Sequence, residues 1–355
     1  MPTVQQELED LFLNTLKLNA SDLHLSVGYK PIVRVDGVLL TLNEFSILTP
    51  EHAEDLAYQL LGERKEIFIE KKEIDFSCVF KDKIRFRANI FFEKGFIGSA
   101  LRLIPSRIKT IEELNLPTML HKIPKLKQGF VLITGPSGHG KSTTLASIID
   151  EINHLRTEHI ITIEDPIEYL FAGDKSLVNQ REIGQDTKSF YNALSSILRE
   201  DPNVIMIGEM RDPETIAAAL TAAETGHLVF SSLHTNSASQ TVNRIIDVFP
   251  PNQQNQIRFQ LANTISAIVS QRLLPRISGG RIPAVEVMFA NNAVSNLIRE
   301  NKTYQLDLVI ETSLESGMIS LNRSLAELVR RGEAAPETAM IYSLNPKEFQ
   351  QIIIQ

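Results

Sequence analysis

A glycine-rich segment that ends in lysine and serine is the first candidate for chemistry in this sequence. Residues 135–142 read Gly-Pro-Ser-Gly-His-Gly-Lys-Ser and fit the pattern G-x-x-x-x-G-K-[ST]. The glycines let backbone N–H groups close around phosphate oxygens, and a following helix would add its positive end. Lys141 would then reach the β- and γ-phosphates of ATP, and the Ser142 hydroxyl would ligate Mg²⁺. The residues that we expect to contact the nucleotide are Gly135, Ser137, Gly138, His139, Gly140, Lys141, Ser142 and Thr143.

Two acidic segments could serve the metal and the water that such a P-loop requires. The apolar run 204–207 leads into Glu209, in the shape of a Walker B strand. The run 159–163 leads into Glu164 and two further carboxylates, which would repel one another unless a cation lay nearby. Alone, either segment would more often be a solvated loop. Behind a P-loop, we expect Glu164 and Glu209 to hold Mg²⁺ together with Ser142 and to orient the attacking water, and which acid does more stays open.

Two histidines bracket the apolar run 228–233. His234 follows the run, at the carboxyl end of the expected strand, where ligands collect in open α/β sheets. It could therefore sense the γ-phosphate or the attacking water, although a lone strand histidine is more often part of a hydrogen-bonded core. His227 precedes the run and could be either structural or a residue that communicates between sites.

Short, nearly continuous apolar runs separated by helical patterns must position these residues. The runs lie at 130–134, 159–163, 204–207 and 228–230. Such runs are typical of parallel strands that are buried on both faces. The helix between the last two runs has Asp212 as its cap, Pro213 in its first turn and Gly226 at its end. The pattern predicts an α/β core domain.

The regions on either side of this core have different patterns. Before it, a hairpin that turns at Gly37 and an alternating strand at 84–91 predict a smaller α+β domain. Residues 105–110 break both periodicities, and Thr110 could cap a helix that follows them. After about Pro275 helical patterns dominate. The predicted organisation is an N-terminal domain at 1–104, a linker at 105–110, the core at 111–275 and a C-terminal helical subdomain at 276–355.

The composition narrows the classes of function. The 355 residues are 43% hydrophobic, which is enough to fill two sizeable cores. A net charge of −7, no tryptophan and 6% aromatic residues disfavour a nucleic-acid motor, which would need a basic, aromatic-lined channel. No apolar stretch reaches the ~18 residues that span a bilayer, and residues 1–20 lack a secretory pattern, so we expect a cytoplasmic protein. The single cysteine, Cys78, excludes an intramolecular disulfide, and we expect it to be packed rather than reactive.

Four segments resemble, in their order along the chain, the motifs of the secretion-superfamily ATPases. They are the Walker A segment 135–142, the Asp box 164–168, the Walker B segment 201–212 and the His box 222–234. Within that superfamily the chain is similar to the PilT-type pilus retraction motors. Segments 21–26 and 244–250 support the resemblance, which covers nearly the whole chain. Residues 293–300 are similar to the retraction signature Ala-Ile-Arg-Asn-Leu-Ile-Arg-Glu, with valine for isoleucine and Ser295 in place of a positive charge.

Departures and absences refine this resemblance. Ser137 and His139 stand where the family often has threonine and serine, at positions that offer backbone N–H groups to the nucleotide. Pilus-assembly and type II secretion ATPases usually carry a tetracysteine zinc motif and a longer N-terminal region, so a single cysteine and a short N-terminal domain favour a retraction motor. The form Gly-Glu-Met-Arg-Asp at 208–212 favours the PilT type over PilU, the accessory retraction ATPase and the nearest alternative. Ser295 could alter how its helix engages a neighbour or a partner.

The resemblance implies a fold and an assembly. The fold would be a RecA-like P-loop ATPase domain of the α/β class, with a smaller α+β, PAS-like N-terminal domain and a C-terminal helical subdomain. The assembly would be a homo-hexameric ring that holds ATP between the P-loop domain of one subunit and the N-terminal domain of its neighbour. Arg87 and Arg102, with Arg85 in reserve, would neutralise the γ-phosphate across that interface, although each could be a solvated sheet residue.

The function that the resemblance implies is ATP hydrolysis that powers type IV pilus retraction and twitching motility. The implied partner is an inner-membrane pilus platform protein, reached from the cytoplasmic face of the membrane. A second retraction ATPase is a further candidate partner, and nucleic acid is not expected. Two rival functions are a nucleic-acid motor of the same fold and a catalytically idle, nucleotide-gated binding module. The presence of both candidate acids and of His234 argues against the idle module.

Overall fold

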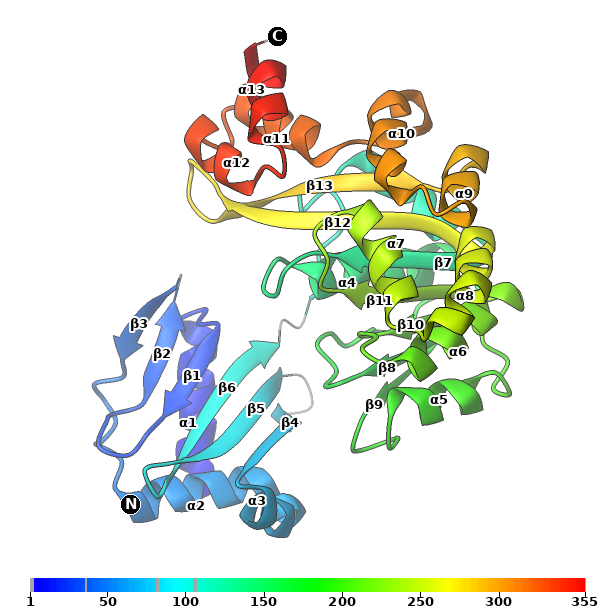
Figure 1. The fold of residues 1–355 in the computed structure, drawn as a ribbon. Helices are drawn as coiled ribbons and strands as arrows, with labels where there is room; N and C mark the ends of the chain where they lie inside the picture. Colours follow the sequence, from blue (N-terminus) through cyan, green and yellow to red (C-terminus); the bar gives the residue numbers. More distant parts are fainter. Residues whose placement is uncertain (1–2, 36, 81–83, 105–106, 355) are drawn as a thin grey trace. The chain divides into compact units, whose positions relative to one another are not determined.

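The computed structural model describes residues 3–35, 37–80, 84–104 and 107–354, which fold into two compact units (Figure 1). The N-terminal unit holds the described residues up to Arg107 together with Pro166–Leu170. The second unit holds Ile108–Asp165 and the described residues from Phe171 onward. The division falls within the predicted linker, of which residues 105 and 106 lie outside the described part of the chain.

The N-terminal unit is an antiparallel sheet that packs against helices. Its strand order is β3-β2-β1-β6-β5-β4. The strands are β1 (Asp22–Leu25), β2 (Ile32–Val35), β3 (Val38–Thr41), β4 (Glu73–Phe80), β5 (Ile84–Glu93) and β6 (Phe96–Ile104). The helices are α1 (Val4–Lys17), α2 (Pro50–Leu61) and α3 (Lys65–Lys71), with the 3-10 turn η1 (Gly62–Arg64). The predicted hairpin is confirmed, since β2 and β3 pair antiparallel and Gly37 has a φ of 85°.

Strand β5 shows why one face of this sheet is buried. Phe86, Ala88 and Ile90 are fully buried, whereas the residues between them are half-buried. The ring of Phe86 stacks on that of Phe12 from α1, with centroids 4.3 Å apart. Burial of such a side chain stabilises the fold by about 1.5–3 kcal/mol relative to exposure. The alternation predicted for 84–91 is thereby confirmed, and it leaves the arginines of β5 on the face away from α1.

The only cysteine of the chain, Cys78, lies on β4. Its burial raises the pKa of the thiol to about 11, and a hydrogen bond with the Phe86 backbone and the cations Arg85 and Arg64 offset this only in part. The thiol therefore stays protonated at neutral pH, as expected for a packed cysteine rather than a reactive one.

The second unit is built on a seven-stranded sheet with the order β13-β12-β7-β11-β10-β8-β9. Six of these strands run parallel to their neighbours, and β13 pairs antiparallel with β12. The strands are β7 (Gly129–Thr134), β8 (His159–Glu164), β9 (Leu177–Glu182), β10 (Val204–Ile207), β11 (Leu228–Leu233), β12 (Ile265–Pro275) and β13 (Arg281–Phe289). The four apolar runs predicted to be parallel strands are confirmed as β7, β8, β10 and β11.

Helices surround this sheet and follow its last strand. The first set is η2 (Thr118–Lys125), α4 (Lys141–Leu155), α5 (Phe190–Ile197), α6 (Pro213–Glu224), α7 (Ala238–Asp247) and α8 (Pro251–Thr264). The second set is α9 (Asn292–Arg299), η3 (Thr303–Gln305), α10 (Leu306–Thr312), η4 (Leu314–Ser316), α11 (Leu321–Arg330), α12 (Pro336–Tyr342) and α13 (Pro346–Ile354). Across the described part of the chain, no helix combines the length and the hydropathy that crossing a bilayer requires.

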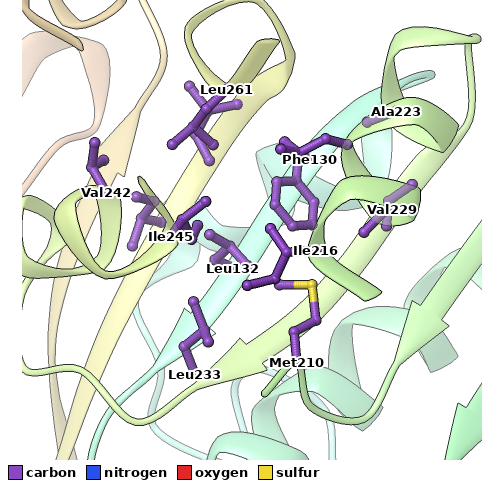
Figure 2. Close-up of a cluster of buried hydrophobic side chains, with 14 of the residues drawn as sticks. Phe130, Leu132, Met210, Ile216, Ala223, Val229, Leu233, Val242, Ile245 and Leu261 are labelled. Atoms are coloured by element: carbon purple, nitrogen blue, oxygen red, sulfur yellow. The ribbon is translucent and has the colours of Figure 1, made fainter. Parts of the chain in front are cut away.

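The central strands are apolar along their whole length because each face of the sheet has its own hydrophobic core. On β7, Phe130 and Leu132 belong to a cluster with residues of α5, α6, α7 and α8, part of which Figure 2 shows. Val131 and Ile133 point the other way and belong to a second cluster with residues of α4 and η2. A strand with helices on both faces has no solvated side, which explains the continuous apolar runs in the sequence.

Helix α6 begins and ends at the residues predicted for it. The Asp212 side chain accepts the N–H of Thr215 at 2.7 Å, which satisfies one of the first backbone donors of the helix. Pro213 occupies the first turn, and Gly226 follows the helix with a φ of 101°. The helix is therefore fixed between β10 and β11, next to the site described below.

Two local predictions were wrong. The helical structure expected from residue 276 onward does not include 281–289, which form β13. This strand is buried along its length because Val285 and Val287 face the cluster of α4, whereas Ile282 packs with α11. The helix expected after Thr110 is a turn at 111–115.

The Thr110 hydroxyl does cap that turn, accepting the N–H of Glu113 at 3.3 Å. Asn115 then adopts a left-handed φ of 55°, and Pro117 follows two residues later. A left-handed residue and a proline both oppose continuation of a helix, so the segment stops after one turn.

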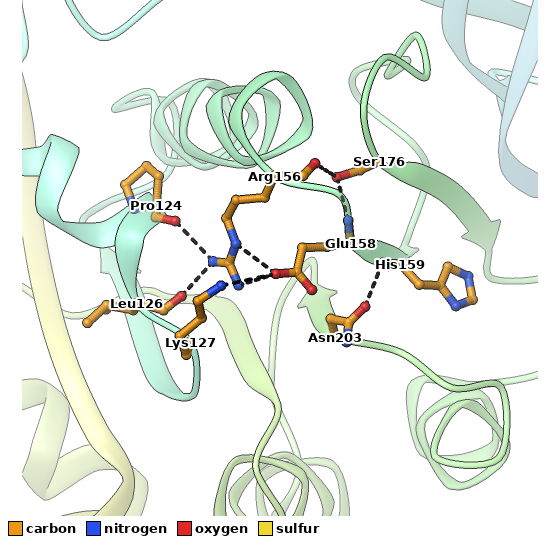
Figure 3. Close-up of polar contacts among 8 residues, drawn as sticks. All are labelled: Pro124, Leu126, Lys127, Arg156, Glu158, His159, Ser176 and Asn203. Atoms are coloured by element: carbon orange, nitrogen blue, oxygen red, sulfur yellow. Dashed lines mark hydrogen bonds and ion pairs between the residues drawn. The ribbon is translucent and has the colours of Figure 1, made fainter.

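The segments that precede β7, β8 and β9 are joined by a group of residues that we call the amino-end cluster, drawn in Figure 3: Arg156, Glu158 and Ser176 with the carbonyls of Pro124 and Leu126. The Arg156 guanidinium, only 11% exposed, donates to the carbonyl oxygens of Pro124 and Leu126 and to Glu158. The Ser176 hydroxyl donates to the carbonyl of Arg156 at 2.7 Å and accepts the N–H of Glu158. These bonds join three chain segments at the amino end of the sheet.

Candidate nucleotide-binding site

The glycine-rich loop predicted to bind phosphate connects β7 to α4 at the carboxyl end of the sheet. Three of its glycines have positive φ: Gly135 at 146°, Gly138 at 76° and Gly140 at 80°. A Cβ at Gly135 would lie 2.4 Å from the carbonyl oxygen of Gln271, and one at Gly140 would lie 2.9 Å from the Gln271 amide nitrogen. The loop therefore needs glycine at these positions both for its backbone conformation and for its close approach to β12.

The strand registers bring the separate sequence motifs to one edge. Thr134, the last residue of β7, pairs with Leu233 of β11. On the other side of β11, Ile207 of β10 pairs with Ile163 of β8. Because parallel strands end together, the P-loop and the residues at or just after the ends of β8, β10 and β11 lie side by side. Those residues are Glu164, Glu209 and His234.

Lys141, His234 and Glu209 form a chain of charged and polar groups at this edge. The Lys141 ammonium donates to the carbonyl oxygen of Pro136 at 3.0 Å and lies 3.4 Å from Nδ1 of His234. The other ring nitrogen of His234, Nε2, lies 3.5 Å from a carboxylate oxygen of Glu209. Glu209 also forms an ion pair with Arg211. The structure thus brings together three residues that the sequence analysis placed in one site.

Glu209 is positioned by the glycine before it. The N–H of Gly208 donates to the carbonyl of Ile163 at 2.8 Å, and the Ser232 hydroxyl donates to the carbonyl of Gly208 at 2.7 Å. A Cβ at this glycine would lie 3.4 Å from the Ile163 carbonyl oxygen and 3.5 Å from the Cα of Glu164. These contacts hold the backbone of Glu209 between β8 and β11.

Glu164 is more enclosed than Glu209. It is 5% exposed and accepts hydrogen bonds from the Thr162 hydroxyl at 2.7 Å and from the Gln180 amide at 3.1 Å. Thr162 and Gln180 are register partners on β8 and β9, so the two donors come from adjacent strands. The sequence analysis missed Gln180, because nothing in the local pattern of β9 connects it to the acid that precedes it by sixteen residues.

The loop is also held by residues of the β12–β13 hairpin that the sequence analysis missed. The Gln271 side chain accepts the Thr144 hydroxyl at 2.7 Å and donates to the carbonyl of His139 at 2.8 Å. From β13, Arg281 donates to the carbonyl of Gly138 at 3.2 Å. These contacts join positions more than a hundred residues apart, with separations of 127 to 143 residues. The hairpin therefore supports the P-loop from the side opposite β11.

The donor chemistry of Ser142, Glu164 and Glu209 fits Mg²⁺. A hydroxyl and two carboxylates are hard oxygen ligands, and Mg²⁺ in nucleotide sites is held by few protein oxygens together with phosphates and water. The described residues contain no group of three or more histidine, cysteine or acidic side chains placed to hold a metal by themselves. The enclosed position of Glu164 at the end of β8 and the position of Ser142 in the first turn of α4 are compatible with this arrangement.

The candidate arginines belong to the N-terminal unit. Arg87 on β5 and Arg102 on β6 are direct register partners, so two positive charges lie opposite each other on one face of the sheet. Carboxylates balance them: Asp22 bonds Arg102 at 2.9 Å, and Asp75 lies 3.7 Å from Arg87. Nearby, Arg85 donates to the Ser77 hydroxyl at 2.6 Å.

His227 lies at the amino end of β11, away from the phosphate edge. Its Nδ1 lies 2.9 Å from the carbonyl oxygen of Ala222 and 3.2 Å from the Thr225 hydroxyl, both near the end of α6. These contacts favour the structural alternative for this residue.

Comparison with known proteins gives consistent matches. Residues 110–280 match the family described as type II/IV secretion system protein. The chain is 43% identical to the type IV pilus retraction ATPase PilT of Pseudomonas aeruginosa over 97% of its length and 100% of that protein. Its identity to the type IV pilus ATPase PilU of the same organism is 36%, over 98% of this chain and 91% of that protein. A crystal structure of the pilus retraction motor PilT with bound ADP superposes with a TM-score of 0.91 at 46% identity, covering 99% of both chains.

Proposed function

Because this chain belongs to the PilT-like ATPases of the type II/IV secretion family, we propose that it hydrolyses ATP to power retraction of a type IV pilus. The observation that carries the proposal is the meeting of Lys141, His234 and Glu209 at the carboxyl edge of the sheet. The similarity to PilT over nearly the whole chain supports pilus retraction as the mechanical output, with twitching motility as the movement that retraction would drive.

The residues of the site have distinct roles in this proposal. Backbone N–H groups of the P-loop and the start of α4 bind the phosphates, and the Lys141 ammonium lies against the β- and γ-phosphate oxygens. Ser142, Glu164 and Glu209 would hold Mg²⁺, and the metal would supply positive charge that offsets the charge of the phosphates. An attacking water donates a hydrogen bond to a carboxylate oxygen of Glu209. The Glu209 carboxylate lies 3.5 Å from the His234 ring, and this contact keeps the carboxylate near the P-loop. The new bond joins the water oxygen to the γ-phosphorus as the bond from the γ-phosphorus to the β-phosphate oxygen breaks. ADP leaves with that oxygen, and the proton of the water passes to the Glu209 carboxylate and from there to the released phosphate or to solvent.

The finer assembly is also a proposal. We place ATP between subunits of a homo-hexamer, with Arg87 and Arg102 supplied by the N-terminal unit of a neighbour. In support, the Arg87 and Arg102 side chains are 35% and 67% exposed, and Asp75, the partner of Arg87, is 48% exposed, whereas Asp22, the partner of Arg102, is 13% exposed. An exposed ion pair such as Arg87–Asp75 contributes about 0–1 kcal/mol, so phosphate oxygens could replace the Asp75 carboxylate at small cost.

The partner in this proposal is an inner-membrane pilus platform protein, which the motor engages from the cytoplasmic face of the membrane. A second retraction ATPase is a further candidate partner. Helix α9 carries the segment that resembles the retraction signature, with Val294 and Ile298 buried and Ser295 half-buried. A serine in place of a positive charge would change how this helix meets such a partner.

Complementation of a bacterium that lacks its own retraction ATPase tests the proposal. The wild-type chain is expected to restore twitching, and Lys141→Ala is expected not to, because it lacks the phosphate-binding cation. Purified wild type that hydrolyses ATP but restores no retraction would reject the mechanical task while leaving the ATPase intact. Hydrolysis stimulated by DNA would favour a nucleic-acid motor, and nucleotide binding without turnover would favour the idle module.

A further inference from the structure

His139 occupies a variable position of the P-loop, and its side chain faces β12. Nδ1 of the ring accepts the backbone N–H of Leu273 at 2.9 Å, while the His139 carbonyl accepts the Gln271 amide at 2.8 Å. One loop residue is therefore tied to β12 through both its backbone and its side chain. The ring lies beside Tyr342 of α12, with centroids 6.2 Å apart.

The length of β12 explains why its backbone offers an N–H group to the loop. Strand β7 ends at Thr134, which pairs with Ser270, whereas β12 continues to Pro275. Beyond Ser270 the β7 ladder no longer covers that edge of β12. The His139 ring supplies an acceptor there, in the place where the next strand residue would have been. The family often has serine at this position. A serine side chain is shorter than histidine and has no ring nitrogen, so it could not reach the Leu273 N–H in the same way.

This hydrogen bond requires a neutral imidazole. A ring nitrogen that accepts from an N–H must carry a lone pair, so the proton of neutral His139 is on Nε2. The charged groups that face the ring are Arg272 on β12, Lys141 on α4 and Arg281 on β13, and the titratable Tyr342 lies on α12. Burial, followed by these three cations, holds the pKa of His139 below its usual value, so the ring is neutral at pH 7.

We propose that neutral His139 is a positioning residue that fastens the P-loop to β12, and that protonation of its ring releases the loop and weakens nucleotide binding. The inference rests on the proposed binding of nucleotide by this loop. His139 acts through Leu273 rather than by touching phosphate with its side chain. An acceptor at Nδ1 is the property that matters, so asparagine, whose side-chain oxygen can occupy nearly the same place without titrating, should replace it best.

The test is the dissociation constant of a fluorescent ADP analogue with Mg²⁺, measured on the full chain between pH 5.5 and pH 8. Four proteins are compared: wild type, His139→Ala, His139→Asn and His154→Asn. His154 is an exposed histidine on α4 outside the site and serves as the control for general titration. Titration of the ADP phosphate itself is common to all four proteins and cancels in their ratios.

At pH 8 we expect His139→Ala to bind about tenfold more weakly than wild type, because the Leu273 N–H loses its acceptor. His139→Asn should restore most of that affinity. Towards pH 5.5 the affinity of wild type should fall progressively relative to His139→Asn, and His154→Asn should follow wild type throughout.

Other outcomes overturn the inference. If the ratio of the dissociation constants of wild type and His139→Asn stayed constant with pH, the neutral ring would have no role in nucleotide binding. Tighter binding by wild type than by His139→Asn at low pH would show that an imidazolium contacts phosphate directly. If wild type bound no nucleotide at any pH, the proposed function itself would fail, and this result is separate from the other two.

Discussion

Charged side chains lie at both ends of the parallel strands of the second unit, but they are largely buried and tightly hydrogen-bonded at the amino end and more loosely held at the carboxyl end. At the amino end, the Arg156 guanidinium is 11% exposed and donates to two carbonyls and a carboxylate at hydrogen-bond distance (Figure 3). At the carboxyl end, Lys141, His234 and Glu209 approach one another only at 3.4–3.5 Å, and the His234 side chain is 52% exposed.

This difference separates a structural polar cluster from a binding site. The hydrogen bonds of Arg156 are short and numerous, so breaking them costs stability. Contacts at 3.4–3.5 Å are at the limit of hydrogen bonding and can be exchanged for contacts with a ligand at little cost. We therefore expect substitution of the loosely held side chains at the carboxyl end, Lys141, His234 and Glu209, to reduce activity and leave folding intact, whereas substitution of Arg156 at the amino end should do the reverse.

The largest effect is expected for Lys141→Ala. Removing the cation that meets the β- and γ-phosphates should lower ATP turnover by about 10³-fold. The melting temperature should stay within about 2 °C of wild type, because the Lys141 ammonium lies 3.4 Å from the His234 ring, at the limit of hydrogen bonding. Turnover assays and calorimetry on the same preparation check this, and a parallel loss of stability would mean that the lysine belongs to the fold.

Gly135→Ala should be the next largest change. Its Cβ would lie 2.4 Å from the Gln271 carbonyl oxygen at a φ of 146°, so β12 or the loop must shift. We expect the free energy of unfolding to fall by about 3 kcal/mol, together with a loss of nucleotide binding. Gly138→Ala is the matched control, since its φ of 76° is also left-handed but its Cβ would meet nothing within 4 Å.

For that control, the expected loss in urea unfolding is about 1–2 kcal/mol, the cost of the left-handed backbone alone. Equal losses for the two alanines would contradict the close packing of the loop against β12.

Arg156→Ala tests the amino end. Three acceptors lose a donor, and the Glu158 carboxylate, 15% exposed, keeps an ion pair with the exposed Lys127 at 3.6 Å. We expect the free energy of unfolding to fall by about 3 kcal/mol while turnover per folded molecule stays within about twofold. Arg331→Ala, which removes an arginine that is 70% exposed, should cost less than about 0.5 kcal/mol. A large loss of turnover in folded Arg156→Ala would abolish the contrast between the two ends.

A smaller, pH-dependent effect is expected at Glu286 on β13. Its carboxylate accepts the N–H of Ala238 at the start of α7 at 2.7 Å, and burial raises its pKa to about 7. Because this folded-state pKa lies above the unfolded value, the protein loses stability as the pH rises from about 4.5 to about 7. Glu286→Gln keeps the acceptor without the charge.

This variant should therefore exceed wild type in stability by on the order of 2 kcal/mol at pH 8, with a difference that shrinks towards pH 5. Melting temperatures of both proteins, measured at intervals of one pH unit, test whether this difference in stability grows with rising pH. A difference that grew as the pH fell would contradict the assignment of the raised pKa to burial.

The sequence could predict the parts of the molecule whose causes are local. Local requirements of a single segment explain the positive φ of the P-loop glycines, the Asp212 cap and the apolar runs of β7, β8, β10 and β11. Adjacency of Glu164, Glu209 and His234 followed from the rule that parallel strands end at one edge.

Parts with distant causes could not be predicted. Gln271 and Arg281 support the loop across 127 to 143 residues, and no local pattern marks them. Strand β13 escaped prediction because Pro283 and the buried Glu286 interrupt its apolar pattern, and its place in the sheet depends on β12 and α11. The roles of Arg87 and Arg102 depend on a neighbouring subunit, which neither the sequence nor one chain can supply.

The most direct test of the central claim is a crystal structure of this chain with Mg²⁺ and a non-hydrolysable ATP analogue. We expect the β- and γ-phosphates to lie within hydrogen-bond distance of the Lys141 ammonium, and the Ser142 hydroxyl oxygen to bind the metal at about 2.1 Å. The central claim also requires that Glu164 and Glu209 face the metal or its bound water. A loop at 135–142 without nucleotide, or a metal that neither acid approaches, would contradict it.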